Sequence, residues 1–181
     1  MSRTAVARAP EVVDGFVFRL MDEVGAREVL AWRYPPPYDV YNASADRIDA
    51  DVKALLDPEN SYYLVCDSAG TVLAYCCYGP DARVPGGDYR ADALDVGLGV
   101  RPDLTGRGQG SRHVSAVLQF GHTIFGPTAC RVTVARFNGR ALRVWRKAGF
   151  QQVQTFRRKT DGMPFVVLMR SEDVVGLLPD R

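Results

Sequence analysis

The sequence predicts one α/β domain, in which a mixed, largely antiparallel sheet of about seven strands packs against about four helices. Short apolar runs with a period of two alternate along the chain with segments whose apolar residues recur every three or four positions. In addition, residues 94–137 form a strand–helix–strand unit, which favours parallel pairing of its two strands. The length of 181 residues suits one domain over 11–181, with 1–10 as a flexible leader.

The first third of the chain predicts one strand and two helices. Phe16–Met21 is expected to be a strand. Gly25–Arg33 is expected to be a short helix that ends before three consecutive prolines, the first of which is Pro35. Apolar residues at helical spacing predict a second helix over Ile48–Leu56, which Asp57 and Pro58 end.

The rest of the chain predicts six strands and two further helices. One helix follows the glycine-rich loop near residue 110, and a shorter one runs from Asn138 to a C-terminal cap at Gly149. The six strands are Tyr62–Cys66, Val72–Tyr78, Leu94–Val100, Cys130–Phe137, Phe150–Phe156 and Phe165–Met169.

Composition excludes several functions. A net charge of +2 provides no argument for binding nucleic acid or a membrane surface. The apolar runs are too short to span a bilayer, and the N-terminus lacks the apolar core of a secretory signal, so we expect a cytoplasmic protein. The four cysteines lie in apolar runs without metal-ligand spacing, so we expect buried thiols and no metal: Cys66, Cys76, Cys77 and Cys130.

The stretch Leu94–Arg112 carries the main functional signal. A strand of alternating residues is followed by a loop with Gly106, Gly108 and Gly110, and an amphipathic helix begins directly behind this loop. Glycines let backbone N–H groups approach a ligand closely, and a helix N-terminus adds about half a unit of positive charge. The combination predicts a phosphate-binding site that needs no metal.

Two common phosphate-binding loops fit this stretch poorly. A P-loop requires a lysine directly before its Ser or Thr, and no lysine precedes Ser111. A dinucleotide fingerprint requires GxGxxG behind the first strand, whereas this loop reads GxGxG behind about the fourth. Basic residues do concentrate in the second half of the chain. They are either a solvated face or a surface for an anionic cofactor or an acidic partner.

Two short motifs match a known family. Val100–Pro102 and the segment 105–110 match a Val-x-Pro strand end followed by Q/R-x-x-G-x-G/A, with Thr at the first position. Asn138, Ala141, Gly149 and Phe150 match a second signature, N-x-x-A followed by Gly-Phe. Over about residues 60–170 the chain therefore resembles the GNAT superfamily of acyl-CoA-dependent N-acetyltransferases. The resemblance implies a sheet that is split between the fourth and fifth strands.

The resemblance also implies where acetyl-CoA binds, with CoA as product and no metal. The cofactor lies in the split, its pyrophosphate on the glycine loop and its pantetheine arm beside the preceding strand. Glycines within that strand, Gly97 and Gly99, indicate either such a close approach or a bulge. The cofactor-binding residues implied are Leu98, Gly99, Val100, Thr105, Gly106, Arg107, Gly108, Gln109, Gly110, Ser111, Asn138, Ala141 and Trp145.

Two residues bear on the acid–base chemistry. Asp95 lies where the family often places an acid that deprotonates the amine, so it is the predicted catalytic residue; the alternative is a salt-bridged or solvent-facing aspartate. Trp145 stands where the family often has the tyrosine that protonates the departing thiolate, and indole cannot supply that proton. His113 and His122 are expected to be ordinary helix residues.

A proline-stiffened loop between the first two helices is the predicted acceptor site. Its predicted substrate-binding residues are Tyr34, Tyr38, Asp39 and Tyr41, and the alternative is a loop that only packs. Together, the motifs and the resemblance predict an N-acyltransferase, in which an amine of a small molecule or peptide attacks the thioester directly. The rivals are a non-catalytic acyl-CoA-binding or sensing module on the same fold and a nucleotide-binding domain. A homodimer is allowed, and the acceptor stays open.

Overall fold

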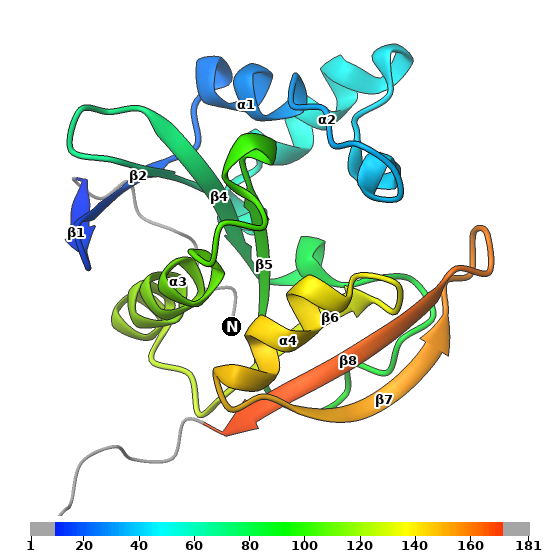
Figure 1. Cartoon of the computed structure of the whole chain (residues 1–181). Coiled ribbons are helices and arrows are strands. Elements are labelled where there is room, and N and C mark those ends of the chain that lie inside the picture. The colour runs from blue at the N-terminus through cyan, green and yellow to red at the C-terminus, as the bar shows by residue number, and fades with distance from the viewer. Residues whose placement is uncertain (1–9, 172–181) are drawn as a thin grey trace, which may run out of the picture.

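The computed structural model describes residues 10–171, and these form one open sheet of eight strands with four α-helices (Figure 1). The predicted leader falls almost wholly outside the described residues. The order across the sheet is β1-β2-β3-β4-β5-β6-β8-β7, and every pair is antiparallel except β5 and β6. The strands are β1 (Glu11–Val13), β2 (Phe16–Leu20), β3 (Tyr63–Cys66), β4 (Val72–Tyr78), β5 (Leu94–Val100), β6 (Ala129–Ala135), β7 (Gln151–Arg157) and β8 (Pro164–Ser171).

The helices divide into two pairs, one on each face of the sheet. Figure 1 shows α1 and α2 together at the top of the view, and α3 and α4 below them. Short 3-10 turns complete the connections. The helices are α1 (Glu23–Leu30), α2 (Ile48–Leu56), α3 (Gly110–Phe125) and α4 (Gly139–Lys147), and the turns are η1 (Tyr38–Tyr41), η2 (Ala45–Arg47), η3 (Pro58–Asn60), η4 (Pro80–Ala82) and η5 (Pro102–Leu104).

The fold class is as predicted, with two corrections in the first third of the chain. The extra strand β1 has only three residues, Glu11–Val13, too few to show a period in the sequence. Helix α1 begins at Glu23 rather than Gly25, because the Oδ1 atom of Asp22 accepts a hydrogen bond from the Gly25 N–H at 2.7 Å. It ends at Leu30 rather than Arg33.

Each helix pair buries an apolar stripe against alternate residues of the strands. On one face, Ala26 of α1 and Val52 of α2 belong to one buried cluster with Leu64 of β3. On the other face, Phe120 of α3 stacks on Phe18 of β2 at a centroid distance of 4.3 Å. Burying each such side chain contributes on the order of 1.5–3 kcal/mol, so these two clusters hold the sheet between its helices.

The sheet splits between β5 and β6, as expected from the resemblance. The two strands pair only at Leu94 with Cys130 and at Asp95 with Arg131. Beyond these pairs they diverge, because β5 continues beside β4 while β6 stays in register with β8 over its whole length. The split therefore leaves one edge of each strand facing a gap.

A buried ion pair lies at the point where β5 and β6 part. The Nε and Nη2 atoms of Arg131 donate to the two carboxylate oxygens of Asp95 at 2.6 and 2.8 Å. The Arg83 Nε atom also donates to Asp95, at 2.7 Å. Arg131 and Asp95 are 1% and 2% exposed, and Arg131 further donates to the Ala91 carbonyl at 2.9 Å. One bidentate pair thus ties the two halves of the sheet to the loop before β5.

Replacing Arg131 by Met should destabilise the fold strongly. The substitution leaves the buried Asp95 carboxylate with only Arg83, whose side chain is 41% exposed, so we expect a loss of about 3–5 kcal/mol in the free energy of unfolding. Urea unfolding followed by circular dichroism measures this loss.

Two further variants check the cause. Arg83→Met removes the exposed partner of Asp95 and should cost no more than about 1 kcal/mol. The double variant Asp95→Leu/Arg131→Met removes both buried charges and should recover much of the loss of the single variant. A double variant less stable than Arg131→Met would contradict this account.

Candidate functional site

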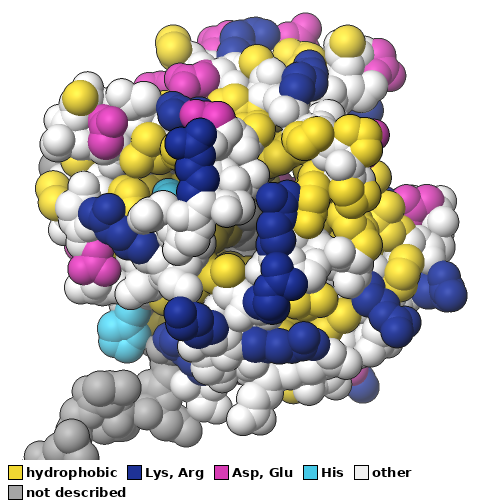
Figure 2. Space-filling model, viewed as in Figure 1, with side chains coloured by type: hydrophobic (Ala, Val, Ile, Leu, Met, Phe, Trp, Pro, Cys, Tyr) yellow, Lys and Arg dark blue, Asp and Glu magenta, His cyan; other side chains and the backbone are white. Residues whose placement is uncertain are grey.

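A cavity of about 680 Å³ opens where β5 and β6 diverge. Its walls come from both strands, the loop before α3, the N-terminal part of α3, the inner face of α4 and the turn η1. Figure 2 shows a hollow in this face of the molecule, with Lys and Arg side chains beside it and a group of hydrophobic side chains next to these. The cavity is therefore basic along one side and apolar along another.

The glycine loop forms one end of this cavity. Gly106 and Gly108 have left-handed backbone conformations, with φ of 76° and 78°, which L-residues with a side chain rarely adopt. A Cβ atom added at Gly108 would meet nothing within 4 Å. The backbone N–H groups of residues 106–111 have no hydrogen-bond acceptor among the described residues. The loop thus presents unpaired donors around an open space.

The N-terminus of α3 lies directly behind these donors. Its N-cap is Gln109, which makes no side-chain capping bond, and the Gln109 carbonyl accepts from the N–H groups of Arg112 and His113. Gly110 has a packing role, because a Cβ atom there would lie 3.0 Å from Cγ2 of Val144 in α4. Gly110 therefore lets α3 and α4 approach, and the positive end of the α3 dipole is left for an anion.

Helix α4 contributes positive charge to the same cavity. Asn138 caps the helix, since its Oδ1 atom accepts from the Ala141 N–H at 3.1 Å. Arg140, Arg143 and Lys147, spaced at i, i+3 and i+7, all line the cavity. The sequence showed this basic cluster but did not distinguish a solvated face from a cofactor surface. The helical spacing is the signal that separates these three from Arg146, which bonds to Gln152 instead.

The backbone of β5 offers hydrogen bonds to the gap. The Asp95 carbonyl accepts from Gly79 N–H and the Arg101 N–H donates to the Leu73 carbonyl, both at 2.9 Å and both on the β4 side. The backbone N–H and C=O groups of successive residues point to opposite sides of a strand. Those of Leu98 therefore point away from β4, into the gap. In agreement, the Val100 carbonyl accepts from the Tyr34 hydroxyl at 2.8 Å.

Side chains of β4 account for the two glycines inside β5. A Cβ atom at Gly97 would lie 2.6 Å from the Cys77 sulfur, and one at Gly99 would lie 2.4 Å from the Tyr75 ring. The β4–β5 register is continuous, so the bulge, which was the alternative explanation for these glycines, is absent from this strand pair. The glycines thus make room for cross-strand neighbours, which the sequence could not show.

Tyrosines of the loop before α2 close the cavity. Tyr34, Tyr38 and Tyr41 all line it. The Arg140 guanidinium lies 3.9 Å from the centre of the Tyr38 ring, and its Nε atom donates to the Tyr38 hydroxyl at 2.9 Å. The Tyr41 hydroxyl accepts from Asn138 at 3.2 Å. The loop is thereby fixed to the start of α4.

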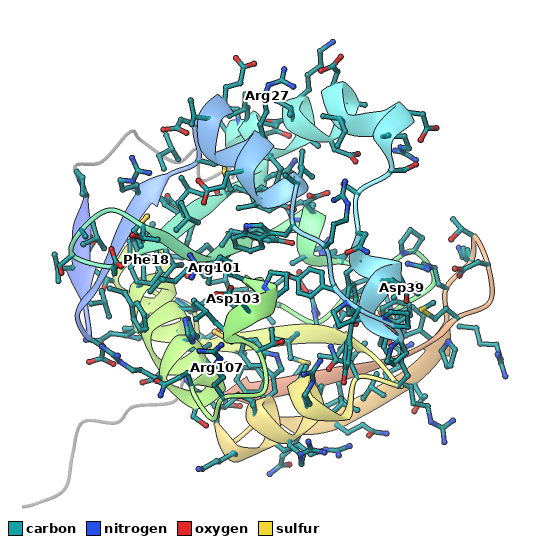
Figure 3. The ribbon with its side chains drawn as sticks, turned by 45° about the horizontal axis from the view of Figure 1, so that its top comes forward. Phe18, Arg27, Asp39, Arg101, Asp103 and Arg107 are labelled. Atoms are coloured by element: carbon teal, nitrogen blue, oxygen red, sulfur yellow. The ribbon has the colours of Figure 1, made fainter. Side chains whose placement is uncertain are left out.

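Eleven of the predicted cofactor residues line the cavity, and four predicted site residues do not. Asp39 is exposed on η1, and Arg107 is exposed on the glycine loop (Figure 3). Gln109 does not line the cavity, but its carbonyl accepts the first hydrogen bonds of α3. The Asp95 carboxylate is held by Arg131 and Arg83, and its assignment as a base stays a prediction. The eleven are Leu98, Gly99, Val100, Thr105, Gly106, Gly108, Gly110, Ser111, Asn138, Ala141 and Trp145.

A family model described as "Acetyltransferase (GNAT) family" matches residues 26–150. The chain belongs to the GNAT acetyltransferase family. GNAT proteins use acetyl-CoA, and the matched range includes the glycine loop, both diverging strands and α4. No curated protein sequence matches the chain.

Solved structures share the GNAT fold at low sequence identity. A GNAT-family acetyltransferase from Bacillus anthracis is 11% identical, with a TM-score of 0.70 over 92% of this chain and 100% of that one. An aminoglycoside N(6′)-acetyltransferase from Legionella pneumophila is 20% identical, with a TM-score of 0.65 over 87% and 92%. A spermidine N-acetyltransferase mutant from Vibrio cholerae is 13% identical, with a TM-score of 0.62 over 87% and 94%. At these identities the likeness shows the fold alone.

Residues 10–171 of this GNAT protein show no metal site, membrane-spanning helix or disulfide. No group of three or more His, Cys, Asp or Glu there is arranged to hold a metal ion. No helix in that range is long and apolar enough to cross a membrane. All four cysteines are buried, and no disulfide joins them.

Trp145 is a core residue that also lines the GNAT cavity. It is 5% exposed, and its ring contacts Phe150 edge to face at 5.1 Å. The indole therefore holds α4 against the chain that leads into β7, in addition to shaping the cavity wall.

Trp145→Ala should destabilise the protein by about 3–5 kcal/mol, because it leaves a cavity in a packed core. Trp145→Phe keeps most of the contact with Phe150 and should retain most of the turnover, since indole has no titratable proton to lose. Melting temperature and thiol release, measured on both variants and on Trp145→Tyr, check this. A stable Phe variant without activity would assign the indole N–H a direct role.

His113 and His122 both lie in α3, as expected, but His113 is buried whereas His122 is exposed. His113 is 4% exposed and lines the cavity, and its Nδ1 atom lies 3.0 Å from the Gln109 carbonyl. Its Nε2 atom is buried without a partner among the described residues. Burial lowers the pKa of His113 below its usual value.

This lowered pKa predicts a stability change with pH. Below about pH 6.5 the unfolded chain binds a proton at this histidine that the folded chain does not, so stability falls as pH falls toward the folded pKa. His113→Gln should show a smaller loss of unfolding free energy between pH 7 and pH 5 than the wild type. Equal losses in urea titrations of the two proteins would remove this explanation.

Proposed function

We propose that this GNAT protein transfers an acetyl group from acetyl-CoA to an amine of a small molecule or peptide. The observation that carries the proposal is one continuous cavity that joins unpaired backbone donors, a helix N-terminus and three cations to a tyrosine-lined end. Acetyl-CoA, a substrate of the reaction, supplies the acetyl group as a thioester.

The residues present fit that substrate. The glycine loop and the α3 N-terminus offer N–H groups and a partial positive charge for a pyrophosphate. Arg140, Arg143 and Lys147 supply countercharge from α4. The free edge of β5 at Leu98 offers backbone bonds to an amide-containing arm, in the manner of an added strand.

The same backbone edge supports direct attack by the amine. N–H groups of β5 that point into the gap are placed to polarise a carbonyl there, as donors of an oxyanion hole do. Direct attack needs no nucleophilic side chain, and Cys77 is a poor candidate for an acyl-enzyme because it is buried behind Gly97 and burial raises the pKa of its thiol to about 12. The nitrogen of the acceptor is therefore the attacking atom.

A non-catalytic acyl-CoA-binding module is the second candidate. Two observations favour it: Trp145 stands at the usual tyrosine position, and Asp95 is held in an ion pair. Release of free thiol from acetyl-CoA in the presence of an amine separates the two functions, because only an enzyme turns over.

Gly108→Val should weaken CoA binding at least tenfold, on the order of 1.4 kcal/mol, because its side chain enters the open space in front of the unpaired N–H groups. Titration calorimetry with CoA measures the affinity.

Gly70→Val is the matched control. Gly70 also has a left-handed backbone, with φ of 86°, and also has nothing within 4 Å of an added Cβ, but it lies in the turn between β3 and β4. It should strain the fold similarly and leave CoA affinity unchanged. Equal affinities of the Gly108 variant and the wild type would count against the proposed function.

A further inference from the structure

The acceptor end of the cavity is the part that the glycine loop, α3 and α4 do not form. Aromatic rings dominate it, and Phe137, which does not line the cavity, extends the aromatic surface by packing on Tyr38 and Tyr41 with centroid distances of 5.7 and 6.0 Å. Besides the strand backbones, the side chains of the acceptor end are Tyr34, Tyr38, Tyr41, Tyr75, Ala82, Thr133 and Phe165.

No carboxylate lines this cavity among the residues that the structure describes. Asp39 on η1 is exposed and does not line the cavity, and three other carboxylates nearby have partners of their own. Asp95 is held by two arginines, Asp103 pairs with Arg101 at 2.7 Å, and Asp81 accepts from the Tyr62 hydroxyl at 2.5 Å. An ammonium ion entering the acceptor end would meet no countercharge on the cavity wall.

The cavity also repels additional positive charge. Arg140 already covers one face of the Tyr38 ring at 3.9 Å, so that ring is not free to bind a second cation on this face. Arg143 and Lys147 add two more cations to the same cavity. Like charges in one site disfavour the protonated form of a bound amine. A polycation is therefore a poor fit.

Among the described residues, the acceptor end holds no carboxylate or imidazole that could take a proton from an ammonium ion. Burial raises the pKa of Tyr34 and Tyr41, and it raises that of Tyr75 to about 12, so all three hydroxyls keep their protons. His113 lies on α3, outside the acceptor end, and its Nδ1 atom faces the Gln109 carbonyl. Any acceptor must therefore arrive as the free base.

We propose that the acceptor is a weakly basic amine, with an appreciable free-base fraction near neutral pH, that is carried on an aromatic body, as in an aromatic α-amine. This inference rests on the proposed function and narrows its substrate class. In the reaction the amine nitrogen forms the new C–N bond, the thioester C–S bond breaks, and the proton released by nitrogen goes to the departing sulfur. The chemistry disfavours lysine side chains, polyamines and aminoglycosides.

The amine's own ionisation sets the size of the preference. An α-amine titrates near pH 7.7–8.0 and a lysine-like amine near 10.4, so their free-base fractions at pH 7 differ by roughly two orders of magnitude or more. Part of this advantage is lost because a weaker base is also a weaker nucleophile. We therefore expect a net preference of at least about tenfold.

Thiol release from acetyl-CoA at pH 7 tests the proposal on two matched amines. Phenylalaninamide and phenethylamine share one aromatic body, and the carboxamide lowers the basicity of the first. We expect phenylalaninamide to be acetylated at least about tenfold faster, with alaninamide, which lacks the ring, and spermidine both slower. A short peptide that begins with Phe distinguishes a chain terminus from a free small amine as the source of the α-amine.

The pH profile separates the amine's titration from that of an enzyme base. The rate with phenethylamine should rise about tenfold per pH unit up to pH 9, whereas that with phenylalaninamide should level off near its own pKa. One shared profile for both amines would reveal a titrating enzyme group and overturn the proposal.

Adding a carboxylate to the acceptor end should reduce the preference. Tyr41 lines the cavity and is 44% exposed, so it accepts a polar side chain. Tyr41→Glu should raise the turnover of phenethylamine relative to phenylalaninamide about tenfold over the isosteric neutral control Tyr41→Gln. Equal ratios in the two variants would contradict the role assigned to the missing countercharge.

The outcomes distinguish this inference from the proposed function. If the wild-type protein does not bind CoA in calorimetry, the proposed function is wrong. Intact CoA binding with phenethylamine or spermidine favoured at pH 7 would overturn only the inference about the acceptor. Intact CoA binding with no acetylation of phenylalaninamide or the Phe peptide would also overturn it.

Discussion

The ion pair between Asp95 and Arg131 is the constraint on which the rest of the structure depends. Only two residue pairs join β5 to β6, and one of them is this pair of charges. Both groups are almost fully buried, so separating them would leave an uncompensated charge in the core. The two half-sheets are thereby joined at one point and are free to diverge beyond it, and the cavity occupies the resulting space.

The same ion pair has a chemical consequence. The Asp95 carboxylate accepts from Arg131 at 2.6 and 2.8 Å and from Arg83 at 2.7 Å, so both of its oxygens already have arginine partners. The residue that the family resemblance offers as a base therefore also holds the two half-sheets together, and its role as a base stays a prediction. Much of the binding surface is backbone, namely the N–H groups of residues 106–111 and the free edge of β5, so affinity depends on conformation as well as on side-chain chemistry.

Local features of the sequence predicted most of the fold. The strand, glycine loop and helix over residues 94–125 follow from alternation, left-handed glycines and amphipathic spacing, all of which are encoded within a few residues. What the sequence could not show depends on distant partners. Asp95 and Arg131 are 36 residues apart, and the neighbours of Gly97 and Gly99 lie on another strand. Tyr75 likewise joins the acceptor end only through the pairing of β4 with β5.

The two departures from the usual GNAT acid–base groups fit one scheme of proton transfer. A strongly basic acceptor arrives as an ammonium ion and needs a base to release its lone pair. A weakly basic amine has an appreciable free-base fraction at neutral pH, so it depends less on a base such as Asp95, which is held in an ion pair. After attack, the nitrogen carries a proton that it readily loses, and a departing thiolate is basic enough to take one near neutral pH, since thiols titrate near 8.5. The nitrogen's own proton can thus replace the tyrosine proton that Trp145 cannot supply. The acceptor proposed here is the one for which neither missing group is needed.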